Sequence, residues 1–143
     1  IYYLYELSEM YAREGLGHER ASQMARLGSL ARAGVPVALH SDYTMAPALP
    51  LNSAWVAANR INAAGRVMAP EERLTLDQAL RAITMDAAYV LGMENEIGSI
   101  RAGKKADFAV LEQDPYEIPV EELKDIPVWG TVFEGTPFQA NRQ

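Results

Sequence analysis

The run Gly34-Val-Pro-Val-Ala-Leu-His-Ser-Asp42 constrains the fold of this chain more than any other segment. Its apolar stretch from Val35 to Leu39 predicts a short buried β-strand, and a helical pattern from Glu19 to Ala33 leads into it. Gly34 is well placed as the C-terminal stop of that helix. A helix that passes through one glycine into a buried strand is typical of α/β proteins with parallel strands.

Asp42 follows this strand directly, at the point where parallel α/β barrels place their chemistry. A carboxylate there can bind a metal ion, accept a proton from a bound water, or do both. The alternative is a structural carboxylate that closes a turn or caps a helix. Asp42 is therefore the candidate catalytic residue and the candidate metal ligand.

Three neighbours of Asp42 are candidate substrate-binding residues. His40 lies two positions earlier, so both side chains would point to the same face of a strand. The alternative is a packed histidine whose ring nitrogens bind backbone groups. Tyr43 and Thr44 would line the mouth of a pocket in a barrel, or else belong to an ordinary loop.

The remaining pattern divides the chain into a helical and a mostly β part. The strongest helix signal follows Thr75, where Thr75 and Gln78 fit a capping box. Helices are expected over 1–14, 19–33, 52–63, 75–91 and 119–124, and strands over 35–39, 97–100, 108–112, 128–133 and 136–138. Glu134-Gly135 is expected to form a hairpin turn. We expect two domains, 1–95 and 96–143. The tyrosines of the first helix are expected to pack in the core.

Composition excludes several classes of function. The net charge is −6 without a clustered basic face, so no nucleic-acid partner is expected. No apolar stretch approaches the roughly 20 residues that span a bilayer, so no membrane partner is expected. The chain has no cysteine, which excludes thiolate metal sites and agrees with a reducing compartment, so we expect a cytoplasmic location.

Four segments together carry a family resemblance. Gly34 to Asp42 resembles the eighth barrel strand of the amidohydrolase superfamily, and Leu74 to Gly92 is similar to its helical linker. The segment from Ile97 to Pro115, which contains Gly-Lys-Lys-Ala-Asp, resembles the return to its small β-sandwich. Val128 to Gly135 resembles the last hairpin. The nearest branch is amidohydrolase-3, with relatives of N-substituted formamide deformylase.

This resemblance implies the last portion of a (β/α)8 barrel followed by part of a small β-sandwich, and an α+β protein as an isolated chain. It implies hydrolysis of a C–N bond in a small-molecule substrate by metal-activated water. A divalent metal, zinc by preference, would be bound in the intact parent, where Asp42 would bind the metal and shuttle the proton.

The chain departs from this pattern because it contains two histidines, His18 and His40, and no His-x-His pair. We therefore interpret it as a C-terminal fragment that is inactive alone, and two alternatives stay open: the chain binds a divalent metal, or it binds none. The alternative is a non-catalytic α+β interaction module. An unpaired parallel strand would expose backbone groups, so we expect a homo-oligomer or association with the missing N-terminal part.

Overall fold

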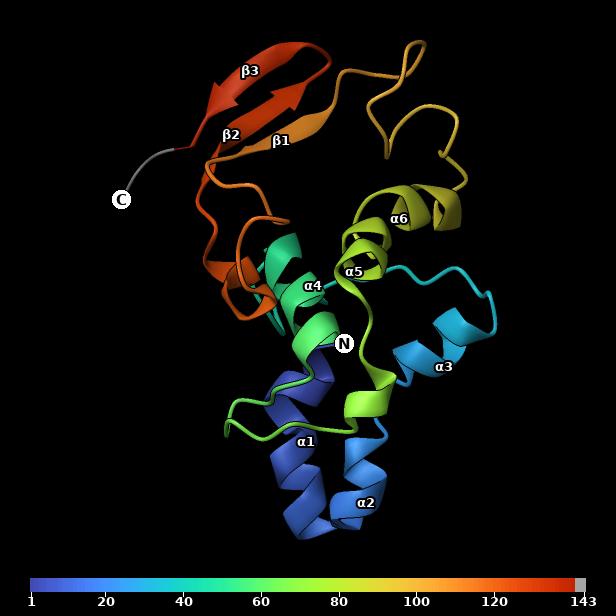
Figure 1. Cartoon of the computed structure of the whole chain (residues 1–143), viewed down its shortest axis with the longest axis vertical. Coiled ribbons are helices and arrows are strands. Elements are labelled where there is room, and N and C mark those ends of the chain that lie inside the picture. Colours follow the sequence, from blue (N-terminus) through green and yellow to red (C-terminus); the bar gives the residue numbers. More distant parts are fainter. Residues whose placement is uncertain (141–143) are drawn as a thin grey trace.

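The computed structural model describes residues 1–140 as a group of short helices with a three-stranded sheet at one end (Figure 1). None of the described helices is long and apolar enough to cross a membrane. The elements are α1 (Tyr2–Glu14), α2 (Gly17–Ser22), α3 (Leu27–Arg32), α4 (Pro50–Asn59), η1 (Pro70–Glu72), α5 (Leu76–Ala82), α6 (Met85–Val90), β1 (Phe108–Leu111), η2 (Val120–Asp125), β2 (Val128–Phe133) and β3 (Thr136–Gln139).

Helix α4 lies at the centre of the core, because its seven residues from Ser53 to Asn59 are all buried. Its Trp55 ring contacts the Tyr5 ring of α1 edge to face, with centroids 6.1 Å apart. On another side the Trp55 indole N–H donates to the Glu121 carbonyl of η2 at 2.6 Å. Leu123 of η2 is fully buried in the same core cluster. The predicted division into domains 1–95 and 96–143 stays a prediction. Helix η2, from the predicted second domain, packs on α4, from the predicted first domain.

Arg60 joins the helical segments through a buried guanidinium. The residue follows α4 with a left-handed backbone and has no exposed surface. Its side chain donates to the carbonyls of Met68 at 2.5 Å, Ala25 at 2.7 Å, and Ser22 and Met24 at 2.9 Å each. Burial lowers the pKa of Arg60 to about 10, and the charges of Glu72 and Glu71 oppose that shift. The guanidinium therefore stays charged at neutral pH and ties the α2–α3 connection to the chain after α4.

Glu72 makes a second buried connection, between η1 and α3. Its carboxylate accepts from the Ser29 amide at 2.6 Å and from the Ser29 hydroxyl at 2.5 Å. Arg32 and Arg26 approach the same carboxylate at 3.3 and 3.5 Å. Gly28 allows this close approach, since a Cβ there would lie 2.8 Å from the Glu72 Cα. The carboxylate is thus fully bonded despite its burial, as buried charges require.

The sheet is antiparallel in the order β1-β2-β3. Glu134 and Gly135 connect β2 to β3 with φ values of 47° and 83°, the two positive values of a type I′ turn. The predicted hairpin is confirmed, as are the strand near 108–112 and the short helix near 119–124. The capping box is confirmed too, because the Thr75 hydroxyl accepts from the Gln78 amide and the Gln78 side chain accepts from the Thr75 amide.

Two predicted strands are absent from the described residues. The segment 35–39 belongs to no strand, and its backbone bonds run from the Val35 amide to the Leu30 carbonyl at 3.0 Å and from the Leu39 amide to the Ala82 carbonyl at 2.9 Å. A parallel strand needs neighbouring strands, and the described residues supply none beside it. Residues 97–99 form bends, and residue 100 has no regular structure. The α+β class is therefore correct, whereas the barrel portion stays a prediction.

Helix boundaries also differ from expectation. The predicted helix 19–33 is two helices, α2 and α3, separated at Ala25, which has a positive φ of 50°. Gly34 does stop α3, with Schellman bonds from the Gly34 amide to the Ala31 carbonyl and from the Val35 amide to the Leu30 carbonyl. The predicted helix 75–91 breaks into α5 and α6 at positions 83–84. The helix expected over 52–63 begins at residue 50 and ends at residue 59.

Candidate active site

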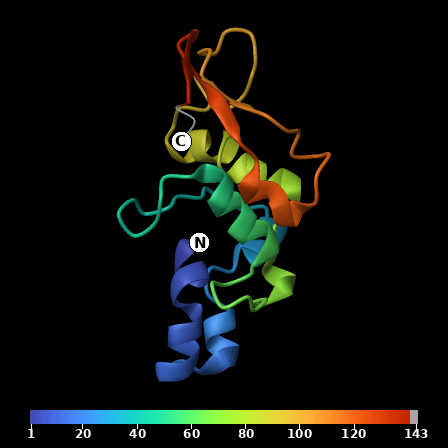
Figure 2. The same ribbon diagram turned by 90° about the vertical axis from the view of Figure 1, so that its left-hand side faces the viewer.

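Asp42 belongs to the connection between α3 and α4, part of which projects from the helices as a loop (Figure 2). The loop is tightly turned at this point, because the Met45 amide donates to the Asp42 carbonyl at 2.8 Å. Asp42 itself has a positive φ of 55°, which aspartate tolerates better than most residues. Thr44 has a φ of 92°, a costly value for a β-branched side chain. Backbone strain is therefore concentrated within two residues of the candidate catalytic carboxylate.

The Asp42 carboxylate is held by a tyrosine from the first helix. The Tyr3 hydroxyl donates to Oδ2 of Asp42 at 2.9 Å, and both residues are exposed. This hydrogen bond and the negative charge of Asp42 raise the pKa of Tyr3. Tyr2 is buried in the core as expected, whereas Tyr3 is not. Sequence reasoning missed this contact, because no spacing rule connects positions 3 and 42.

His40 contacts Asp42 through the backbone. The Asp42 amide donates to Nδ1 of His40 at 3.1 Å. Because Nδ1 acts as an acceptor, a neutral ring carries its hydrogen on Nε2. The bond agrees with the alternative considered for His40, in which a backbone group binds a ring nitrogen. The Nε2–H of a neutral ring is then left to donate to a ligand.

A cleft of about 210 Å³ opens beside this loop. His40 and Ser41 lie in its wall, together with the start of α4. Tyr43 and Thr44 do not line it, and the Tyr43 side chain is 76% exposed. The structure therefore brings His40 to a cleft, whereas Asp42, Tyr43 and Thr44 are exposed and do not line it.

The described residues contain no group of three histidine, cysteine, aspartate or glutamate side chains that could hold a metal ion. Asp42 supplies one carboxylate, and His40 already uses Nδ1 for a backbone bond. Zinc normally takes three or four protein ligands. Within residues 1–140, the side chains near Asp42 therefore do not fit a complete metal site.

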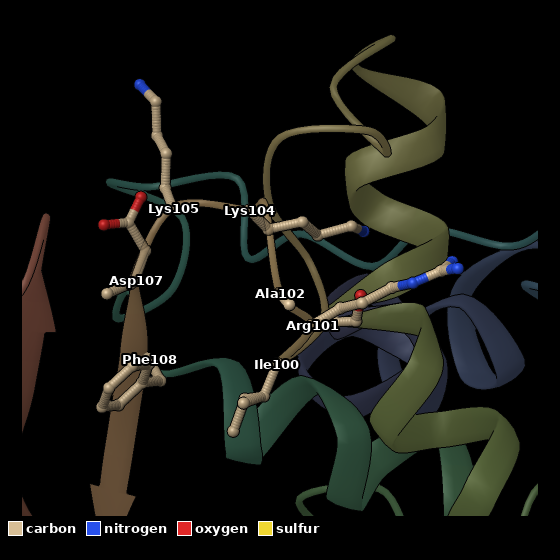
Figure 3. A pocket seen from close by; sticks show the side chains of 9 residues that line it. Ile100, Arg101, Ala102, Lys104, Lys105, Asp107 and Phe108 are labelled. Carbon is tan, nitrogen blue, oxygen red and sulfur yellow. The ribbon is translucent and has the colours of Figure 1, made fainter.

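The Gly-Lys-Lys-Ala-Asp segment lines a second hollow of about 200 Å³ (Figure 3). Its two lysines point in different directions and both have partners. Lys104 donates to the carbonyls of Glu94 and Ile97, and Lys105 pairs with Glu134 at 3.4 Å. The segment therefore closes a turn and attaches it to the hairpin, and its charges are not free to bind an anion together.

Comparison with known proteins identifies the chain's relatives. The sequence profile of the amidohydrolase family matches residues 2–138. N-substituted formamide deformylase from Arthrobacter pascens is 38% identical over 107 residues, which cover 75% of this chain and 20% of the relative. Imidazolonepropionase from Xanthomonas axonopodis pv. citri is 30% identical over 118 residues, which cover 82% of this chain and 27% of the relative.

Solved structures agree with this placement. The amidohydrolase from Thermotoga maritima superposes with a TM-score of 0.52 at 31% identity, covering 80% of this chain and 26% of that chain. An adenosine deaminase from Xanthomonas campestris with bound zinc shares the fold, with a TM-score of 0.59 at 24% identity over 78% of this chain and 27% of that chain. The chain thus spans between a fifth and about a quarter of the length of its relatives.

Proposed function

Because the chain belongs to the amidohydrolase family, we propose that it is the C-terminal part of a metal-dependent enzyme that hydrolyses a C–N bond in a small molecule. Hydrolysis of C–N bonds is the chemistry of this family. The observation that carries the proposal is the match over residues 2–138, which includes Asp42 and the turn before β1. A cytoplasmic location is part of the proposal, and cell fractionation tests it.

Asp42 is the residue to which we assign proton transfer. Its Oδ2 accepts from Tyr3, whereas Oδ1 has no hydrogen bond among the described residues. A carboxylate in that state can accept a proton from an attacking water and pass it to the leaving nitrogen. Tyr3 holds the carboxylate in one orientation, and Oδ1 is the oxygen to which we assign proton transfer.

The metal of such an enzyme would need ligands beyond this chain. Asp42 would contribute one carboxylate, and the other ligands would come from preceding sequence of a longer polypeptide. Zinc is the metal we expect, in keeping with the zinc bound by the adenosine deaminase that shares the fold. The isolated chain is expected to retain less than stoichiometric zinc after dialysis, as measured by elemental analysis.

The test is Asp42→Asn in a polypeptide that joins this chain to the coding sequence upstream of it. Loss of a general base typically slows catalysis by about 10² to 10⁴-fold. Turnover of N-substituted formamides is the first assay, followed by other amides. Asp125→Asn is the matched control, because that carboxylate is exposed and pairs with the neighbouring Lys124. Unchanged turnover in Asp42→Asn would show that the assignment is wrong.

A second candidate function is a non-catalytic module that associates with another copy or with the N-terminal part of its parent. It is favoured by the apolar surface of the sheet, where Phe133 and Phe138 are 59% and 54% exposed. The unpaired segment 35–39 adds free backbone groups. Light scattering should then show dimers or larger species as concentration rises. A monomer at every concentration would count against this candidate.

A further inference from the structure

The cleft beside Asp42 has an apolar wall and a polar end. Leu39, Leu49 and Ile83 form much of the apolar wall. Ser41 and Ser53 lie among the polar lining residues, with no acidic residue in the described lining. A cleft of this kind suits a small ligand with one polar group and a short apolar part.

Ser53 is the most informative of these residues. It lies on the first turn of α4, is 1% exposed and lines the cleft. Its hydroxyl makes no hydrogen bond within the described part of the chain, and its oxygen is not among the fully buried unpaired atoms there, so its small exposed surface is open to the cleft that it lines. A ligand atom in the cleft would supply that missing partner.

The N-terminus of α4 lies at the same place. Leu49 is the N-cap and Pro50 the first helical residue, and both line the cleft. No side chain caps this helix, and its first turn carries no acidic residue. Pro50 has no N–H and the Asn52 amide donates to the Leu49 carbonyl at 3.0 Å, so an anion is favoured here by the positive end of the helix dipole and by the Leu51 amide. His40 adds a donor, because its hydrogen is on Nε2.

We propose that this cleft binds the carboxylate of a small substrate whose short apolar chain lies against Leu39 and Ile83. The inference rests on the proposed function and narrows its substrate class to amides that carry a free carboxylate. A liquid water molecule occupies about 30 Å³. The open cleft of about 210 Å³ has room for several such volumes, so a small ligand of the size of isovalerate fits it.

Titration of the whole chain with isovalerate, followed by amide NMR shifts, tests the site. The amides of residues 51–53 should shift and saturate at millimolar concentration, the range expected for a ligand of this size. Isovaleramide has the same shape without the charge and should bind at least tenfold more weakly. Equal binding of the two probes, or no saturable shift, would overturn the proposal.

Substitutions at two positions locate the ligand. Ser53→Ala should weaken isovalerate binding about five- to tenfold. Leu49→Asp places a carboxylate at the N-cap and should abolish binding while raising the melting temperature, because aspartate is a favourable cap. Leu16→Asp is the matched control, since Leu16 is the exposed N-cap of α2 and does not line the cleft.

Failure of the carboxylate site and failure of the proposed function give different experimental results. Isovalerate binding is measured on this chain without turnover, so an inactive parent or an unaffected Asp42→Asn variant leaves the measurement intact. Conversely, binding that persists in the Leu49→Asp variant would remove the carboxylate site and leave the proposed hydrolysis standing.

Discussion

Replacing Arg60 by methionine tests whether one buried guanidinium holds the helical segments together. Methionine preserves most of the side-chain volume and removes all four hydrogen bonds to carbonyls. The carbonyl of Met68, a fully buried residue, then loses this donor. The carbonyls of Ser22 and Met24, both half-buried, lose charged donors, whereas Ala25 is exposed and can be rehydrated.

The expected cost follows from these partners. A buried acceptor left unpaired costs about 1–3 kcal/mol, and a bond to a charged donor contributes about 1.5–3 kcal/mol net. Relief of the desolvation of Arg60 offsets part of the sum. We therefore expect a loss of about 3–5 kcal/mol, the range found when a buried ionic interaction is broken. Arg60→Lys should be intermediate, because one ammonium cannot reach four carbonyls.

Urea unfolding followed by circular dichroism is the assay. With a slope of about 2 kcal/mol per molar, the midpoint should fall by about 1.5–2.5 M. Arg66→Met is the matched control, because that side chain is 56% exposed and pairs with Glu9 at 3.4 Å, an interaction worth less than about 1 kcal/mol. A loss at Arg60 no larger than that at Arg66 would refute the reasoning.

Three further predictions concern stability. Burial alone would raise the pKa of Glu72, but hydrogen bonds from Ser29 and the charges of the nearby arginines lower it. The contribution of Glu72 to the free energy of unfolding should therefore be fully present above roughly pH 4.5 and be lost as the pH falls through the lowered pKa. Glu72→Gln should flatten that decline in unfolding measured from pH 6 to 3. Gly98→Ala should lower the melting temperature more than Gly103→Ala. Both glycines have positive φ, but a Cβ at Gly98 would lie 2.6 Å from the Cβ of Ala88, whereas a Cβ at Gly103 would meet nothing within 4 Å. Thr75→Ala should cost about 1 kcal/mol by loss of the helix cap, and an unchanged urea midpoint would contradict this.

Local rules explain which elements were predicted. The capping box at Thr75 and the stop at Gly34 depend on bonds within a few residues, so their chemistry can be recognised in sequence. The turn at Glu134-Gly135 likewise needs two residues with positive φ and nothing distant. The break between α2 and α3 was missed, since the carbonyls at that break are held by Arg60, which is 35 or more positions away.

The candidate site shows the same division. The position of Asp42 after an apolar segment is visible in the sequence, and its catalytic role stays a prediction. The hydrogen bond from Tyr3, the bond from the Asp42 amide to His40, and the cleft at the start of α4 join parts of the chain that no periodicity connects.

By itself, the sequence determined the family, the turn chemistry and the helical caps, because these depend on residue identity at short spacing. Tertiary structure decided whether Val35 to Leu39 becomes a strand, which partner holds Asp42, and how the charges of Arg60 and Glu72 are satisfied. A strand and a buried charge share one physical requirement: each needs hydrogen-bond partners from elsewhere in the fold, and only the folded chain determines whether those partners arrive.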